Sequence, residues 1–267
     1  GSATSYPAPQ QVPATDPPKK RRSVMDLLRD PMSLILIIVI ALTLSVAGVI
    51  GGEVYARHRG DTVVAQAVQC VVQDKVDVAF GATPFLWQVA TGTYNNITVT
   101  TAGNQVRFAK GMKAQISLND VKLKKTDKSN GTIGSLDATV TWTNDGIKQT
   151  IADTVPVLGG LISDVSTDPA SGTITLQAPL TQIVAKPTVS DGDLTLQVQQ
   201  LSGLGFMLPH EAIQPALNMF AAQLTNDYPL GIHPDSLQVT ATGVVAKFST
   251  KNATMPLGNQ NSCFAGL

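Results

Sequence analysis

Residues 134–142 read Gly-Ser-Leu-Asp-Ala-Thr-Val-Thr-Trp, and apolar and polar side chains alternate from Leu136 to the end of the stretch. Successive side chains of a strand point to opposite faces, so this pattern predicts a strand with one buried face. Similar alternation recurs along the chain, and Gly, Asn and Asp clusters such as Asp191-Gly192-Asp193 mark turns between the segments. In total we expect eight or nine strands. The further strands are expected around residues 97–99, 116–118, 174–176, 194–198 and 237–241.

Three segments carry helical patterns instead. Asp61 is expected to cap one helix, a second covers Gly146 to Val155, and a third covers Glu211 to Leu224, with Pro215 in its first turn. Each strand offers one aliphatic face, and only 5% of the residues are aromatic. Such a sheet must close on itself or wrap a helix to bury that face. The sequence therefore predicts an α+β domain over residues 61–267, a curved antiparallel sheet around a long helix. Its aliphatic interior would suit either an apolar groove for an acyl chain or an ordinary solid core.

An uncharged apolar stretch precedes this domain. Residues 31–52 contain no charged side chain, and as a helix they would extend about 33 Å, enough to cross a hydrocarbon layer of about 30 Å. Residues 1–30 are rich in proline and polar residues and are expected to form a disordered tail. We therefore predict a tail, a transmembrane anchor at 31–52, a juxtamembrane linker at 53–60 and a folded domain at 61–267.

Basic residues predict the orientation of the anchor. Lys19 to Arg22 and Arg29 precede it, which favours a cytoplasmic N-terminus, a single pass through the inner (plasma) membrane and a periplasmic C-terminal domain. A cleaved signal peptide, with Ser45-Val46-Ala47 as the cleavage site, is the alternative. The two cysteines, Cys70 and Cys263, would pair in an oxidising compartment, and the alternative is two buried free thiols.

Charge and composition exclude several classes of function. Nineteen basic residues balance nineteen acidic ones, without the basic excess of a nucleic-acid-binding protein. Seven basic residues lie between Arg107 and Lys128, either on ordinary solvated faces or on a rim that meets anionic lipid headgroups. We find no nucleophile elbow, phosphate-binding loop, dinucleotide fingerprint or metal-ligand cluster. The sequence thus predicts a protein that is not an enzyme and has no metal, cofactor or nucleic-acid partner.

One region is more distinctive. Residues 76–86 read Val-Asp-Val-Ala-Phe-Gly-Ala-Thr-Pro-Phe-Leu, and Gly92-Thr-Tyr94 opens the segment that continues to Val99. This region resembles the LmeA-like phospholipid-binding family of actinobacteria, including mycobacteria. The resemblance continues through most of residues 61–255. It implies a tubular lipid-binding (TULIP-like) fold with a lipid-sized groove and non-enzymatic phospholipid binding in the cell envelope.

The resemblance and the periodicity together suggest candidate lipid-contacting residues. The Pro84-Phe85-Leu86 corner and Tyr94 belong either to the mouth of a cavity or to a packing corner. The apolar faces of the predicted elements add five more candidates: Leu136, Val140, Trp142, Leu217 and Phe220.

The function we expect is a membrane-anchored periplasmic protein that carries or senses a phospholipid for cell-envelope biogenesis of the lipomannan or lipoglycan type. Its ligand could be anionic, of the phosphatidylinositol type. The alternative is an accessory subunit that binds a protein partner in a larger envelope membrane complex and has no lipid of its own.

Overall fold

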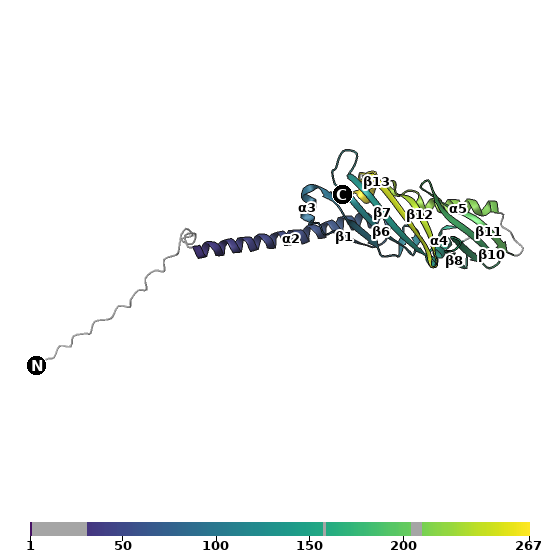
Figure 1. Cartoon of the computed structure of the whole chain (residues 1–267), viewed down its shortest axis with the longest axis horizontal. Helices are drawn as coiled ribbons and strands as arrows, with labels where there is room; N and C mark the ends of the chain where they lie inside the picture. Colours follow the sequence, from purple (N-terminus) through teal and green to yellow (C-terminus); the bar gives the residue numbers. More distant parts are fainter. Residues whose placement is uncertain (2–30, 157–158, 204–209) are drawn as a thin grey trace. The chain divides into compact units, whose positions relative to one another are not determined.

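The structure, a computed structural model, describes Gly1 and residues 31–156, 159–203 and 210–267 (Figure 1). The predicted disordered tail falls on residues outside this description. The chain divides into two compact units, Gly1–Gly51 and Gly52–Leu267. The second unit contains every strand that the structure describes.

One helix, α2, runs from Pro31 to Val72. None of its residues from 31 to 52 is buried in the structure, and this part is long and apolar enough to cross a membrane. The helix continues without a break through residues 53–60, where we expected a linker, and through Asp61, where we expected a new helix to begin. Asp61 therefore does not cap a helix. No proline interrupts residues 32–72, so the backbone hydrogen bonds of the helix can continue past the apolar segment.

The strands form two principal antiparallel sheets, where we expected a single curved one. The larger sheet has the order β1-β3-β6-β7-β13-β12, and the short strand β2 (Thr93–Tyr94) pairs with β6. The strand that contains residues 134–142 is β7, at the centre of this sheet. The bounds of the six ordered strands are β1 Val76–Phe80, β3 Ile97–Thr101, β6 Met112–Lys122, β7 Gly131–Thr143, β13 Gly243–Met255 and β12 His233–Thr240.

The second sheet has four strands in the order β11-β10-β9-β8. At the turn between β10 and β11, Asp191 and Gly192 both have positive φ, at 55° and 82°, as a two-residue hairpin turn requires. A separate two-stranded ribbon joins β4 to β5. The bounds are β8 Asp164–Asp168, β9 Thr173–Ala178, β10 Thr181–Ser190, β11 Asp193–Gly203, β4 Gln105–Val106 and β5 Ala109–Lys110.

Five shorter helices complete the described chain: α3 Phe85–Thr91, α4 Asn144–Thr154, α5 His210–Thr225, and the 3-10 turns η1 Pro229–Gly231 and η2 Ser262–Phe264. α4 begins directly after β7, and the Thr143 side chain caps it by accepting a hydrogen bond from the Gly146 N–H. Pro215 lies five residues after the first residue of α5, so it is in the second turn and not in the first. The α+β class and the antiparallel pairing are confirmed.

The core of the second unit consists of two hydrophobic clusters along the seven-stranded sheet. In the first cluster, residues of this sheet pack with the four-stranded sheet, α4 and α5, and its most buried members include Ile183 and Ile213. In the second, the sheet packs with η2 and the end of α2, through residues such as Val99 and Phe264. Ile116 of β6 packs against both clusters, so the two are continuous along the sheet.

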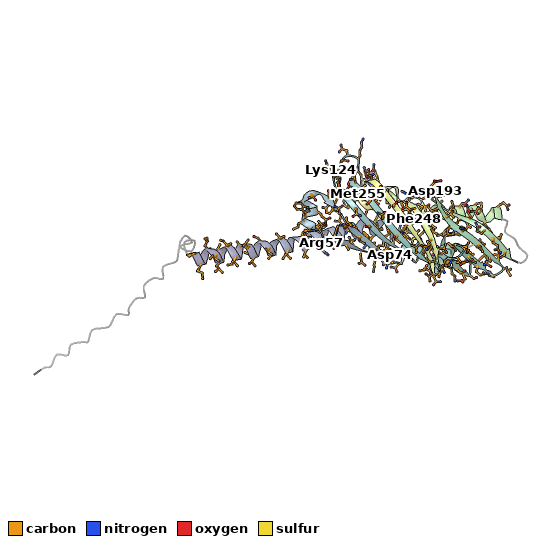
Figure 2. The ribbon with its side chains drawn as sticks, in the orientation of Figure 1. Arg57, Asp74, Lys124, Asp193, Phe248 and Met255 are labelled. Carbon is orange, nitrogen blue, oxygen red and sulfur yellow. A yellow bond between two sulfur atoms is a disulfide. The ribbon has the colours of Figure 1, made fainter. Side chains whose placement is uncertain are left out.

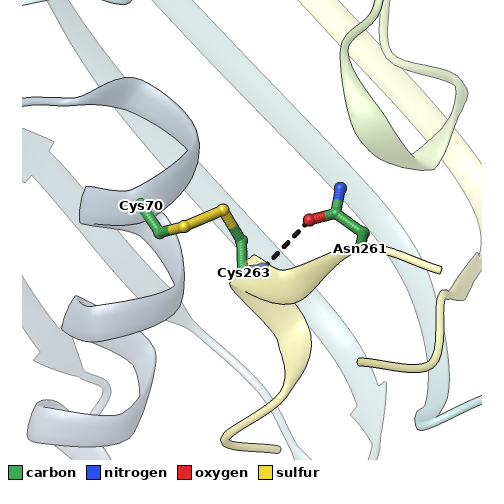
Figure 3. Close-up of a disulfide and its surroundings, with 3 residues drawn as sticks. All are labelled: Cys70, Asn261 and Cys263. Carbon is green, nitrogen blue, oxygen red and sulfur yellow. Dashed lines mark hydrogen bonds between the residues drawn. A yellow bond between two sulfur atoms is a disulfide. The ribbon is translucent and has the colours of Figure 1, made fainter. Parts of the chain in front are cut away.

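A disulfide joins the end of α2 to the C-terminal segment (Figure 3). It links Cys70 and Cys263, whose Cα atoms are 5.4 Å apart. The Asn261 side chain caps η2 beside it and accepts a hydrogen bond of 3.0 Å from the Cys263 N–H. The predicted pairing is confirmed.

Candidate lipid-binding site

Two apolar cavities adjoin along the seven-stranded sheet. The larger, here called the α2 cavity, has a volume of about 500 Å³ and lies between the sheet and the C-terminal part of α2. The smaller, the α5 cavity, has a volume of about 150 Å³ and extends toward α5 and the four-stranded sheet. Five residues line both cavities, so the two are neighbours with a common wall: Val71, Val72, Ile116, Leu136 and Ile232.

Small and branched side chains on one face of α2 line the larger cavity. Gly60, Val64, Ala67 and Val71 follow at spacings of three or four residues, which places them on one stripe of the helix. Gly60 lies against the ring of Phe85 on α3, and a Cβ atom at Gly60 would clash with the Cζ atom of this ring. The small side chains on this stripe leave the space that forms the cavity.

Aromatic stacking marks the boundary between the larger sheet and α5. The rings of Trp142 on β7 and Phe220 on α5 have centroids 6.2 Å apart and planes inclined by 26°. The Trp142 Nε1–H donates a 2.7 Å hydrogen bond to the Lys110 carbonyl oxygen. The N–H group of the indole thus has a backbone acceptor, and the ring presents only its apolar surface to the α5 cavity.

The residues that line the two cavities include few polar or titratable side chains. Apart from the Trp142 indole, its polar groups are the hydroxyls of Tyr55, Tyr94 and Tyr228 and the guanidinium of Arg59. Burial raises the pKa of Tyr94 and of Tyr228, so both phenols stay neutral. No aspartate, glutamate, histidine or lysine side chain lines either cavity in the described part of the chain. The surface is suited to hydrocarbon and carries no acid–base pair.

Most of the residues suggested by the sequence meet at these cavities. Phe85 and Tyr94 line the α2 cavity, and their rings are 5.6 Å apart. Leu136 lines both cavities, and four residues line the α5 cavity: Val140, Trp142, Leu217 and Phe220. Pro84 and Leu86 line neither cavity; Pro84 is exposed before the start of α3, and the partly exposed Leu86 side chain lies near Gly52 of α2.

Sequence reasoning missed the wall that α2 supplies. It recognised Val64, Ala67, Val68 and Val71 as the apolar side of a helix after Asp61 but assigned them no role in binding. The small side chain of Ala67, together with Gly60 one turn before Val64, was the signal that this side of the helix faces a space. Their meaning depends on knowing which sheet the helix covers, and no local pattern gives that.

A polar contact ties α3 to α2 next to the larger cavity. The Glu53 carboxylate accepts hydrogen bonds from the backbone N–H groups of Phe85 and Leu86, the latter at 2.8 Å. These two backbone hydrogen bonds, with the nearby Arg57, lower the pKa of Glu53. Arg57 in turn donates to the carbonyl oxygens of Phe80 and Gly81 (Figure 2 labels Arg57). These bonds fix the position of α3 against the first turns of the second unit.

Comparison with known protein families assigns the chain to a family. The model of the LmeA-like phospholipid-binding family matches residues 51–249 of the chain. The chain belongs to this family. The match covers β1 to β12 and all of the residues that line the two cavities except Met255, Phe264 and Leu267.

Relatives of this LmeA-like protein occur in mycobacteria. The chain is 49% identical over 260 residues to the uncharacterized protein Rv0479c of Mycobacterium tuberculosis, and equally to the uncharacterized protein Mb0489c of Mycobacterium bovis. Each alignment covers 97% of this chain and 73% of the relative. No solved structure matches the chain. The resemblance noted in the sequence is therefore confirmed at the level of the family.

Proposed function

We propose that this protein is a single-pass, membrane-anchored phospholipid-binding protein whose folded unit lies outside the cytoplasm. The acyl chains of one phospholipid would occupy the two adjoining cavities, and its headgroup would remain near Arg59 and Tyr55. The observation that carries the proposal is the pair of apolar cavities that share a wall at Ile116 and Leu136.

The size and lining of the cavities support this ligand class. The α2 cavity, at about 500 Å³, is within the range of roughly 300–1,000 Å³ that small-molecule sites occupy. Each methylene group transferred from water into such a space contributes about 0.8 kcal/mol. A buried acyl chain can therefore supply the binding free energy without any charged contact inside the cavity.

Two features support the proposed location. The apolar start of α2 could anchor the chain, and the basic residues before it favour a cytoplasmic N-terminus. A disulfide such as Cys70–Cys263 persists in an oxidising compartment, as the periplasm is. We infer that the protein carries or senses phospholipid in the cell envelope, in support of lipoglycan-type biogenesis, and that the two sheets and α2 form a TULIP-like lipid-binding fold.

The headgroup proposed here is anionic, of the phosphatidylinositol type. Arg59 is the only cationic residue among those that line the cavities in the described chain, and it lies in the turn of α2 where the α2 cavity begins. A guanidinium binds phosphate oxygens with paired hydrogen bonds. An Arg59→Gln variant would lose this contact and keep the apolar lining.

Lipid extraction from matched variants tests the proposal. Ala67 lines the α2 cavity, whereas Ala65, also half-buried and two residues away on the same helix, does not. An Ala67→Trp substitution should narrow the cavity and lower the phospholipid recovered per protein, while Ala65→Trp should leave it unchanged. Equal recovery from both variants, or no phospholipid in the unmodified protein, would contradict the proposal and favour an accessory subunit of an envelope complex.

A further inference from the structure

The short helix α3 exposes large apolar side chains that its own contacts do not require. Phe85 and Gln88 hold the helix against the second unit, at 5% and 2% exposure. Leu86, Trp87 and Val89 are nevertheless exposed, Trp87 the most of the three at 66%. A cluster of exposed apolar side chains on a firmly held element indicates an interaction surface.

The helix is fixed by several polar contacts as well. The Gln88 side chain donates to the Thr83 carbonyl oxygen at 3.2 Å and accepts from the Asn95 N–H at 2.9 Å. The Glu53 carboxylate binds the first two N–H groups of α3. The exposed position of Trp87 is therefore a property of a helix that these contacts hold in place.

A basic loop lies next to α3 at the same end of the larger sheet. Thr93 and Tyr94, which follow α3, pair with Lys122 and Val121 at the end of β6. The chain then enters an exposed loop that contains Lys124, Lys125 and Lys128. Figure 2 labels Lys124 at this end of the sheet. Asp127 is the acidic residue of this loop, so the loop carries a net positive charge.

The α2 cavity reaches the surface between these two elements. Val89 of α3 and Leu123 of the loop both line the cavity, although they are 48% and 44% exposed. Side chains that are half exposed and still line a cavity stand at its mouth. The mouth is thus flanked by the exposed apolar residues on one side and by the lysines on the other.

We propose that α3 and the basic loop form a docking surface, which places the mouth of the α2 cavity against an anionic lipid bilayer. The docking surface consists of Leu86, Trp87, Val89, Leu123, Lys124, Lys125 and Lys128. Tryptophan is enriched at the interface of a bilayer, and lysines near an anionic surface are attracted to it. Glu53, which holds α3, follows the predicted span by one residue, so the docking surface is tied to the point where the chain would leave the bilayer.

This inference rests on the proposed membrane anchor and adds a route for the ligand. A lipid could move between the bilayer and the cavity without exposing its acyl chains to water, since the mouth would face the headgroups directly. Docking would depend on the charge of the bilayer and on ionic strength, because the lysines are exposed and their attraction is screened by salt.

The two tryptophans of the chain allow docking and cavity filling to be measured separately. Trp87 is on the docking surface and lines neither cavity, while Trp142 lines the α5 cavity and is 5% exposed. The full chain would be placed in nanodiscs of phosphatidylcholine alone or mixed with phosphatidylglycerol. In the Trp142→Phe variant, acrylamide quenching of Trp87 reports docking. In the Trp87→Phe variant, quenching of Trp142 by lipids with brominated acyl chains reports lipid in the cavity.

We expect Trp87 to be shielded from acrylamide in the phosphatidylglycerol discs and less so in phosphatidylcholine or at high salt. Replacement of Lys124, Lys125 and Lys128 by Glu should lower the ratio of docked to undocked protein by about a hundredfold or more. The shielding of Trp87 should then be lost. Reversal of three other exposed lysines, Lys113, Lys186 and Lys247, should leave it intact.

Equal quenching of Trp87 in both kinds of disc and at all salt concentrations would overturn the docking proposal, whatever the variants do. Quenching of Trp142 by brominated lipid in that case would leave the proposed lipid binding in place. The opposite pattern, docking without quenching of Trp142, would keep the docking surface and reject the lipid-filled cavity.

Discussion

Trp142 and Phe220 stack at 6.2 Å between ring centroids, and this contact joins the central strand of the larger sheet to α5. Phe220 is 5% exposed and lines the α5 cavity. The stack therefore limits how far the cavity extends toward α5, and it places an intrinsic fluorophore at the inner end of the proposed lipid site.

A Phe220→Ala substitution should enlarge the α5 cavity and lower the free energy of unfolding by about 3 kcal/mol. This value is at the lower end of the range for truncation of a buried aromatic side chain, because Phe220 already adjoins a cavity. Urea denaturation of the full chain in nanodiscs, followed by far-ultraviolet circular dichroism, measures the change. The Trp142 emission should also change. An unaltered unfolding midpoint would contradict the packing described here.

Gly60 should resist replacement by alanine even though it lies within a helix. Helix propensity alone favours alanine by about 1 kcal/mol. A Cβ atom at this position would clash with the Phe85 ring, which Phe80 and Tyr94 hold in place, so we expect Gly60→Ala to destabilise the protein. Gly52 on the same helix is the control, because its Cβ would meet the Leu86 side chain at an ordinary 3.7 Å. Stabilisation by both alanine variants would show that α3 does not pack against α2 as described.

Much of the secondary structure follows from local patterns, whereas the assembly of the sheets does not. The alternation around Leu136 predicted β7, and Asp191-Gly192 predicted the turn between β10 and β11, since both depend on side-chain direction and backbone conformation within a few residues. The neighbours of β7 are β6 and β13, and β13 lies about a hundred residues further along the chain. No periodicity specifies a pairing between such distant segments or the division into two sheets.

In the candidate site, too, local patterns identified some residues and could not identify others. Trp142 and Phe220 were recognisable as apolar-face residues, and the structure brings both to one cavity. Pro84 and Leu86 shared a sequence motif with Phe85, but a helix turns its side chains by about 100° per residue, so neighbours in sequence face different directions. The wall from α2 was missed because local patterns identify the apolar side of that helix but not the sheet that it covers.

The contact between Glu53 and α3 should depend on pH. Its pKa is lowered below the usual 4.5 by the backbone hydrogen bonds from Leu86 and Phe85, so the ionised form stabilises the folded state. This stabilisation is fully present above about pH 4.5 and is lost as the pH falls through the lowered pKa. In the Trp142→Phe variant, the emission of Trp87 should shift in this acidic range, and Glu53→Gln should remove the transition. A transition that persists in Glu53→Gln would assign it to another group.

Reduction of the disulfide should loosen one wall of the α2 cavity. Cys70 and Cys263 are 193 residues apart in sequence, and on a chain-entropy basis closing such a loop contributes up to about 5 kcal/mol to stability. Reductant should lower the urea midpoint and expose Phe264, which lines the cavity from η2. The Cys70→Ser, Cys263→Ser double variant should unfold at this lower midpoint without reductant. Equal midpoints with and without reductant in the unmodified protein would show that the bond does not stabilise the fold.

The central claim is that the two cavities hold one phospholipid. Native mass spectrometry of residues 52–267, the compact second unit with its own core and disulfide, tests this most directly when the protein is purified without detergent. We predict an added mass of one phospholipid per chain, identified by organic extraction of the same sample. A mass equal to the polypeptide alone, with no uptake from vesicles that contain anionic phospholipid, would contradict the claim.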